Sequence, residues 1–315
     1  MTGPILLSRW VIDHYGAALA EAAPGAPLVV LHDGQVDGDV AAAEIAFFSG
    51  DLFPERVREF LLALRDATGL RWMHTFSAGV DNPFFQSLRQ RGIRLTTSSG
   101  ANAVPIAQTV LWYLLDWSRR AERWRDAQRR KAWERHSVIE LEGRTLGVVG
   151  LGPIGSEVAR LGAALRMRVV GVRRTPRGDE PCETWPLARL DELCRIANAL
   201  VLAVPLSDAT RHLLDARRLA LLPHGAFLVN VGRGALVDEA ALVAALASGP
   251  LGGAGLDVFE IEPLPAESPL WSMPNVIVTP HNSGDAEGNL HRATAMFLDN
   301  LSRYGRGESL RNEVP

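Results

Sequence analysis

The strongest constraint on the fold is a series of short, almost wholly apolar runs in the second half of the chain. Runs rich in Val, Leu and Ile are typical of strands that helices cover on both faces of a sheet. Segments with helical spacing lie between these runs, which favours parallel pairing and a doubly wound α/β domain. The expected strands are Leu146–Val149, Val169–Val172, Leu200–Val204, Phe227–Val231, Gly255–Val258 and Val276–Val278, and the expected helices are Gly155–Leu165, Asp215–Leu222 and Glu239–Ala247.

Residues 1–100 show the same alternation on a smaller scale. Val57–Leu64 places apolar residues at helical spacing between two further apolar runs. A chain of 315 residues exceeds the usual size of one domain, so we expect two α/β domains, each a doubly wound parallel sheet. The expected strands here are Ile5–Leu7, Leu28–Leu31, Ile45–Phe48, Trp72–Thr75 and Ile93–Leu95.

A long helical stretch, Val104–Trp133, separates the two series. Its first half is apolar almost all round, and its second half, from Arg119 to Arg135, is strongly charged. This gradient predicts a helix that is buried at one end and exposed, or facing another subunit, at the other. Its tryptophans are interpreted as core residues or as a dimer contact.

Charge and cysteine usage exclude several classes of partner. The formal net charge of −3 is small for this length, so we expect neither nucleic acid nor an anionic membrane as partner. Cys182 and Cys194 have no nearby histidine to complete a ligand pattern, so no metal site is expected. No secretory signal follows Met1–Pro4, and no apolar stretch is long enough for a membrane span. We therefore expect a cytoplasmic protein.

The segment Gly150-Leu151-Gly152-Pro153-Ile154-Gly155 has the pattern GxGxxG. The pattern alone is weak, but here a predicted strand precedes it and a predicted helix follows. Gly150 would permit the tight turn, Gly152 would let a pyrophosphate approach the backbone, and Gly155 would allow close helix packing. The motif predicts a dinucleotide site, and a purely structural strand–helix turn is the alternative.

The end of the next predicted strand bears on which dinucleotide binds. NAD-binding domains usually carry Asp or Glu there to accept from the ribose 2′-OH. This chain has Arg173 and Arg174 instead, and guanidinium groups can hold a 2′-phosphate bidentately. The pair predicts NADP(H) in preference to NAD(H). The alternative is two solvated arginines in a chain whose only lysine is Lys131.

Three chemically distinct side chains follow later predicted strands. Arg233 lies between two glycines, Glu262 lies within the stretch Asp257–Pro263, and His281 ends a Thr-Pro-His sequence. At the carboxyl edge of a sheet, such groups suit acid–base work on a carbonyl beside a carboxylate. Each also has a structural interpretation: an ion pair for Arg233, a cap or surface residue for Glu262, and a loop histidine for His281.

Taken in order, these motifs resemble the D-isomer-specific 2-hydroxyacid dehydrogenase family. The resemblance runs from the Ser77–Asp81 loop through GxGxxG, then NxxRGxxVD at Asn230–Asp238, then DVFxxEP, to the Thr-Pro-His sequence. It implies a flavodoxin-like substrate domain at 1–100, with 285–315 returning to it, and a Rossmann dinucleotide-binding domain at 101–284. The amphipathic segment Glu287–Tyr304 suits the returning helix, and the family commonly forms homodimers.

The resemblance also implies roles for single positions. Arg233 matches the arginine that binds the substrate carboxylate, His281 the general acid and base, and Glu262 the carboxylate that orients the histidine. Ala78 and Gly79 match backbone amides that bind the substrate carboxylate. The predicted cofactor contacts are the glycine turn with Pro153 and Ile154, the arginine pair, Val204, Pro205, Thr210, Val231, Gly232, Asp257 and His281. Gln108 and Asn282 differ from the residues that are common at these positions in the family. These differences leave details of the dimer and of the substrate pocket open.

The predicted activity is NADP(H)-dependent reduction of a small 2-oxo acid, of the glyoxylate or hydroxypyruvate type, to its D-2-hydroxy acid. One alternative is a formate- or phosphite-oxidising relative, although formate dehydrogenases pair the histidine with glutamine where this chain has Glu262. The other is a nucleotide-sensing, protein-binding corepressor with little turnover. The short segment after the last predicted helix disfavours it, and the length disfavours a phosphoglycerate dehydrogenase with a regulatory domain.

Overall fold

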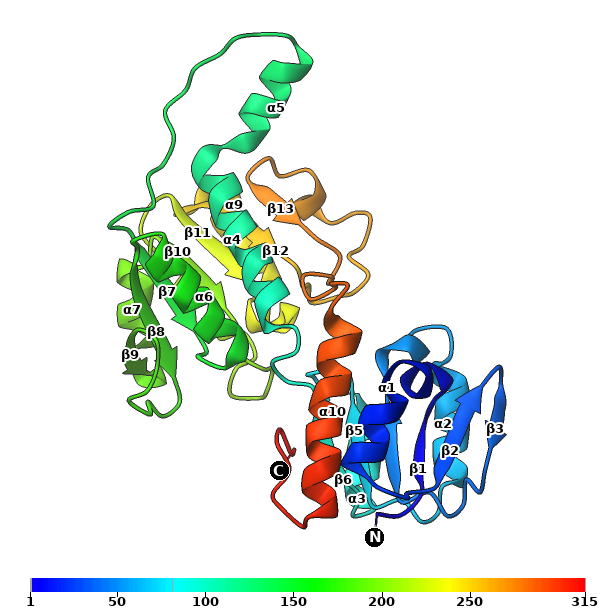
Figure 1. The fold of residues 1–315 in the computed structure, drawn as a ribbon. Coiled ribbons are helices and arrows are strands. Elements are labelled where there is room, and N and C mark those ends of the chain that lie inside the picture. Colours follow the sequence, from blue (N-terminus) through cyan, green and yellow to red (C-terminus); the bar gives the residue numbers. More distant parts are fainter. Residues whose placement is uncertain (1, 81, 315) are drawn as a thin grey trace. The chain divides into compact units, whose positions relative to one another are not determined.

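The computed structural model describes residues 2–80 and 82–314, so Asp81 of the Ser77–Asp81 loop lies outside the described residues. The chain forms two compact units, one of Met1–Asn102 with Ala286–Pro315 and one of Ala103–Asp285. Each unit is built on its own α/β sheet (Figure 1). The predicted fold class is confirmed.

The unit Ala103–Asp285 contains a seven-stranded parallel sheet in the order β13-β12-β11-β10-β7-β8-β9. This is the Rossmann order, which reverses direction between β7 and β10. The edge strand β9 was not predicted because its residues are half-exposed and form no apolar run. The strands are β7 (Thr145–Val149), β8 (Arg168–Arg173), β9 (Glu183–Pro186), β10 (Ala199–Leu202), β11 (Ala226–Asn230), β12 (Leu251–Leu256) and β13 (Val276–Val278).

Helices cover both faces of this sheet, which is why its central strands are apolar at successive positions. In β10, Val201 packs in the core beneath α4 and α6, whereas Leu200 and Leu202 pack in the core beneath α7, α8 and α9. Figure 1 shows the two helical layers on either side of the strands. The helices are α4 (Ala103–Arg119), α6 (Pro153–Ala164), α7 (Leu190–Ile196), α8 (Ala216–Leu219) and α9 (Glu239–Ser248).

The predicted helix Val104–Trp133 is in fact broken. The helix α4 ends at Arg119, Arg120 is left-handed with φ of 53°, and α5 spans only Ala121–Arg129. Ile139 N–H donates to the carbonyl of Ser118 at 2.8 Å, and the His136 ring donates to that of Arg119 at 3.2 Å. The returning chain therefore satisfies carbonyls that a continuous helix would have used. As Figure 1 shows, α5 projects away from the sheet.

The other unit contains a six-stranded sheet in the order β3-β2-β1-β4-β5-β6, parallel except for β3. Without β3 this is the flavodoxin-like order. The unpredicted strand β3 forms a hairpin with β2 through Asp33 and Gly34, both at positive φ. An Asp-Gly pair is a strong hairpin signal that could have been recognised. The strands are β1 (Ile5–Ser8), β2 (Leu28–His32), β3 (Gln35–Asp37), β4 (Ile45–Phe48), β5 (Trp72–Thr75) and β6 (Arg94–Thr97).

The C-terminal helix α10 (Asn289–Gly305) packs with α1 (Arg9–Ala22) on one face of this sheet, and α2 (Val57–Asp66) and α3 (Pro83–Gln90) cover the other. On the α10 face, Phe297 stacks on Phe47 with ring centroids 4.3 Å apart. The buried Asn300 side chain holds the tail by accepting from Arg311 N–H at 2.8 Å and donating to its carbonyl at 3.0 Å. The C-terminal segment is thus integral to the first unit.

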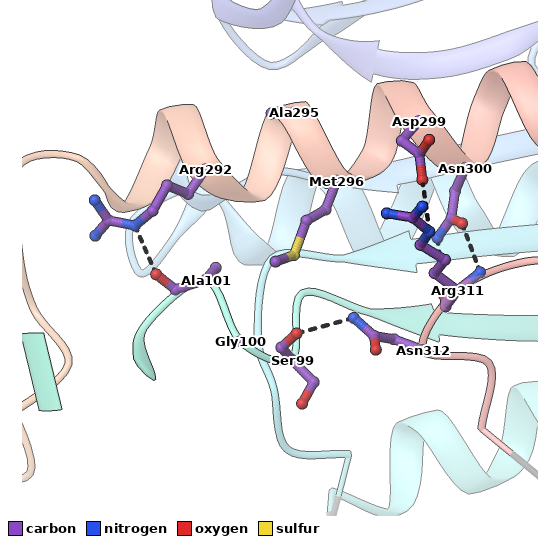
Figure 2. Close-up of a pocket in the computed structure, with 10 residues that line it drawn as sticks. All are labelled: Ser99, Gly100, Ala101, Arg292, Ala295, Met296, Asp299, Asn300, Arg311 and Asn312. Carbon is purple, nitrogen blue, oxygen red and sulfur yellow. Dashed lines mark hydrogen bonds and ion pairs between the residues drawn. The ribbon is translucent and has the colours of Figure 1, made fainter. Parts of the chain in front are cut away.

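A pocket of about 490 Å³ opens beside α10 (Figure 2). Arg292 donates to the carbonyl of Ala101 at 2.6 Å across it, and Asp299 pairs with Arg311 at 3.3 Å. None of the site residues predicted from the sequence is among its lining residues. Across the described part of the chain, no helix has both the length and the hydropathy needed to cross a membrane.

Candidate active site

The glycine turn lies at the point where the Rossmann order reverses, between the end of β7 and the start of α6. Gly150 has φ of 96°, and a Cβ on Gly155 would lie 1.8 Å from the Gly150 carbonyl oxygen. Around a Cβ on Gly152, by contrast, there is no heavy atom within 4 Å among the described residues. The turn therefore packs tightly on the protein side and leaves room above Gly152. The 12-residue helix α6 begins with Pro153 and Ile154. Together, the glycine turn and the N-terminus of this helix fit a dinucleotide pyrophosphate.

The last residue of β8, Arg173, is paired with a carboxylate that the sequence analysis missed. Its Nη1 donates to Glu180 Oε1 at 2.8 Å, and the side chains are 19% and 4% exposed. Backbone N–H groups of Arg177 and Gly178, together with Arg173, lower the pKa of Glu180 to about 2 against the opposing effect of burial. Arg174 is exposed. An acid is thus present at this strand end, contributed by the following loop.

The loop after β10 contains Val204, Pro205 and Thr210. The Thr210 hydroxyl donates to the Pro205 carbonyl at 2.9 Å and accepts from Ser207 N–H at 2.8 Å. These bonds close the loop on itself. Thr210 therefore has a structural role in addition to any contact with a cofactor.

Arg233 follows β11 on a turn that the Asn230 side chain holds. Asn230 accepts from Gly232 N–H at 3.1 Å and donates to the Arg233 carbonyl at 2.9 Å. Val231 and Gly232 are buried within this turn, and Arg233 is half-buried. A Cβ on Gly234 would lie 1.8 Å from the Phe259 carbonyl carbon, so only glycine permits this approach. The Arg233 turn thus rests against the backbone that leads to Glu262.

His281 and Glu262 form a hydrogen-bonded pair. His281 Nδ1 lies 2.8 Å from Glu262 Oε2, and the side chains are 48% and 36% exposed. Because an ionised carboxylate only accepts, Nδ1 carries the proton and Nε2 is directed elsewhere. The other Glu262 oxygen accepts from Phe259 N–H at 3.0 Å, which fixes the carboxylate. The structure therefore pairs Glu262 with His281, and it places both residues and Arg233 in the segments that follow the neighbouring strands β11, β12 and β13.

Asp257 anchors the turn that carries His281. Its carboxylate is 1% exposed and accepts from Thr279 Oγ1 at 2.6 Å, from Asn282 N–H at 3.0 Å and from both the N–H and the hydroxyl of Ser283. Tyr113 of α4 lies 2.5 Å from Thr279 through their hydroxyl groups, and burial raises the pKa of this tyrosine. Asp257 is thus a positioning residue, a role that its sequence pattern did not predict.

The predicted substrate amides of Ala78 and Gly79 lie in the first unit, in the loop after β5. The Ser77 hydroxyl donates to the Gly79 carbonyl at 2.9 Å, and the Ser77 carbonyl accepts from Ser98 N–H at 3.1 Å. The first bond closes the loop on itself, and the second ties it to the residue after β6.

A Rossmann sheet with this glycine turn and an arginine, a carboxylate and a histidine on adjacent strand ends defines a nicotinamide-dependent oxidoreductase. A family model described as D-isomer specific 2-hydroxyacid dehydrogenase, NAD binding domain, matches residues 111–283. The chain belongs to this family of 2-hydroxyacid dehydrogenases.

Relatives of known name differ in the acid that they are named for. The chain is 35% identical to a glyoxylate reductase of Aeropyrum pernix over 78% of its own length and 76% of the relative. It is 34% identical to a D-3-phosphoglycerate dehydrogenase of Methanocaldococcus jannaschii over 80% of its length, but spans only 48% of that protein. A solved NADPH-dependent glyoxylate/hydroxypyruvate reductase of Sinorhizobium meliloti, in complex with NADP and sulfate, has a TM-score of 0.79 and 29% identity, covering 100% of this chain and 98% of that one.

Replacement of Asp257 by Asn tests its positioning role. The amide loses one acceptor oxygen, so the turn carrying His281 should shift and kcat for a 2-oxo acid should fall by about 10- to 100-fold. The affinity for the nicotinamide cofactor, measured by calorimetry, should change little. Ser283→Ala, which removes one donor and keeps the carboxylate, is the control and should have the smaller effect on kcat. Weakened cofactor binding with unchanged kcat would instead assign Asp257 to the cofactor.

Proposed function

We propose that this chain is an NADP(H)-dependent reductase that converts a small 2-oxo acid of the glyoxylate or hydroxypyruvate type to its D-2-hydroxy acid. The observation that carries the proposal is the His281–Glu262 hydrogen bond beside the Arg233 turn, at the edge of the sheet that also holds the glycine turn. Reduction of a 2-oxo acid requires a proton donor, a carboxylate that orients this donor, and a cation that binds the carboxylate of the substrate.

Arg233 would bind the substrate carboxylate and stabilise the negative charge that develops on the carbonyl oxygen. A guanidinium suits both tasks because it presents several N–H donors in one plane. The Asn230 hydrogen bonds keep the backbone of this turn in place. The N–H groups of Ala78 and Gly79 remain the predicted additional donors to the substrate carboxylate.

His281 would donate a proton from Nε2 to the carbonyl oxygen during reduction, and accept it in the reverse direction. Its Nδ1 is committed to Glu262, so the ring can present only Nε2 to a substrate. The Glu262 carboxylate would hold the ring in the orientation that this transfer needs. A bound nicotinamide would supply the hydride for the 2-oxo carbon.

NADP(H) is proposed as the preferred cofactor because Arg173 ends β8 and Arg174 follows it, where an NAD-specific domain would carry an acid. The solved Sinorhizobium meliloti relative, which is NADPH-dependent, supports this choice. The preference for glyoxylate or hydroxypyruvate is likewise supported by the names of relatives. Glu262 in place of glutamine disfavours formate as the substrate.

A homodimer is proposed because the arm formed by α5 and the segment after it exposes large aromatic side chains. Trp133 is 96% exposed and Trp124 is 42% exposed, and Trp112 of the neighbouring helix α4 is 41% exposed. Ion pairs such as Asp126–Arg130 at 2.8 Å stiffen α5. A second copy of the chain would remove these indole rings from water.

The activity prediction is tested with a panel of 2-oxo acids and both reduced cofactors. Glyoxylate and hydroxypyruvate should be reduced, with kcat/KM higher for NADPH than for NADH. Hydroxypyruvate should give the D product because the family is D-specific. Chiral analysis that finds the L product, or oxidation of formate alone, would contradict the proposal. Specific binding of a protein partner without turnover of any oxo acid would favour the corepressor alternative.

The catalytic pair is tested by His281→Ala and Glu262→Gln. Loss of the acid should lower kcat of His281→Ala by roughly 10²- to 10⁴-fold while cofactor binding is retained. Glu262→Gln keeps an acceptor oxygen for Nδ1 but loses the negative charge beside the ring, so kcat for reduction should fall, by less than in His281→Ala, while cofactor binding is retained. His212→Ala is the matched control, because His212 pairs with Glu260 outside this pair. Near-native reduction by His281→Ala would refute the assignment.

The dimer is tested by Trp133→Ser in sedimentation velocity. Removing the most exposed indole ring of the arm should shift the population towards monomer. Trp271→Ser removes a 54% exposed indole elsewhere in the same unit and should leave the sedimentation unchanged. A native protein that sediments as a monomer at micromolar concentration would exclude this interface.

A further inference from the structure

We infer that Glu180 is a specificity-determining residue that limits the preference for NADP(H) over NAD(H), because its carboxylate already occupies Arg173. The inference rests on the proposed function, since it concerns the 2′ position of the proposed cofactor. The two arginines would then contribute unequally. Arg174 supplies most of the discrimination between NADP(H) and NAD(H), and Arg173 contributes little while it is paired with Glu180.

The Glu180 carboxylate is built into the loop that leaves β8. Oε1 accepts from Arg177 N–H at 2.7 Å as well as from Arg173, and Oε2 accepts from Gly178 N–H at 2.8 Å. With a side chain only 4% exposed, it is held in one position beside the guanidinium. Arg174, in contrast, is exposed and makes no hydrogen bond or ion pair with any other residue that the structure describes.

The electrostatic consequence follows from the sign of each charge. A carboxylate with a pKa of about 2 is ionised at any pH at which the enzyme would work. It cancels most of the attraction between Arg173 and a 2′-phosphate, and it repels the phosphate directly. A neutral ribose 2′-OH experiences no such repulsion. The Arg173–Glu180 pair therefore weakens the bound state of NADP(H) relative to that of NAD(H).

The pair also explains why the sequence pattern is ambiguous at this point. The acid of an NAD-specific domain is expected within the strand end itself, where this chain has arginine. Here the acid is Glu180, which comes from the loop after β8. Hydrogen bonds from the loop amides hold its carboxylate beside the same strand end. Both signatures, the arginine and the acid, are present at one position.

The test measures the ratio Kd(NAD⁺)/Kd(NADP⁺) by calorimetry on the full chain, so that it needs no oxo acid. Glu180→Gln should raise this ratio by about tenfold, as expected for removing one negative charge that is hydrogen-bonded to the arginine proposed to bind the phosphate. Arg174→Ala should lower the ratio more than Arg173→Ala does. Arg173→Ala should have a larger effect in the Glu180→Gln background than in the native chain, which a double-mutant cycle measures.

Two further variants separate charge from loop geometry. Glu180→Asp keeps the charge and shortens the side chain, so it should keep the ratio near that of the native chain. Glu183→Gln removes the same charge from an ion pair with Arg168, at the opposite end of β8, and should also leave the ratio unchanged. Circular dichroism of each variant confirms that it folds.

The outcomes distinguish this inference from the proposed function. A ratio that stays constant or falls in Glu180→Gln overturns the inference, as does a Glu180→Asp variant that behaves like Glu180→Gln. Native preference for NAD⁺ contradicts the NADP(H) part of the proposed function, yet the inference stands if Glu180→Gln still raises the ratio. If neither nucleotide binds, both are wrong.

Discussion

The carboxylate of Asp257, buried at the end of β12, joins elements that the sheet alone would leave independent. It accepts hydrogen bonds from the turn of residues 279–283, which follows the next strand, and Thr279 in that turn contacts Tyr113 of α4. A buried carboxylate without such donors would be strongly destabilising, so the turn has one favourable position. The orientation of His281, and hence the geometry of its bond to Glu262, depends on this anchor.

The same principle operates at the other end of the proposed cofactor site. The Glu180 side chain is 4% exposed and is likewise held by backbone N–H groups. One acid fixes the histidine that would move a proton, and the other fixes the arginine that would meet a 2′-phosphate. In both cases a carboxylate that backbone N–H groups hold in place determines what a neighbouring side chain can do.

Much of the fold could be predicted because burial on both faces of a parallel sheet leaves a strong signal. Apolar runs such as Ile45–Phe48 and Leu146–Val149 lie in fully buried strands, whereas the half-exposed β9 has no such run. The break at Arg120 could not be predicted, since the bonds that end α4 come from the returning segment around Ile139. The β3 hairpin could have been, from its Asp-Gly turn.

The sequence by itself determined the order of the motifs, the family, and the residue types that stand at the strand ends: the glycine turn, Arg233, Glu262 and His281. These follow from local pattern, because strand, turn and helix preferences act over a few neighbouring residues. Only the tertiary structure decided which groups pair with these and other side chains through hydrogen bonds. Asp257 is saturated by the turn of residues 279–283, and Arg173 is paired with Glu180 by the way the loop after β8 folds back. Hydrogen bonds between separate segments depend on three-dimensional approach, which local spacing does not encode.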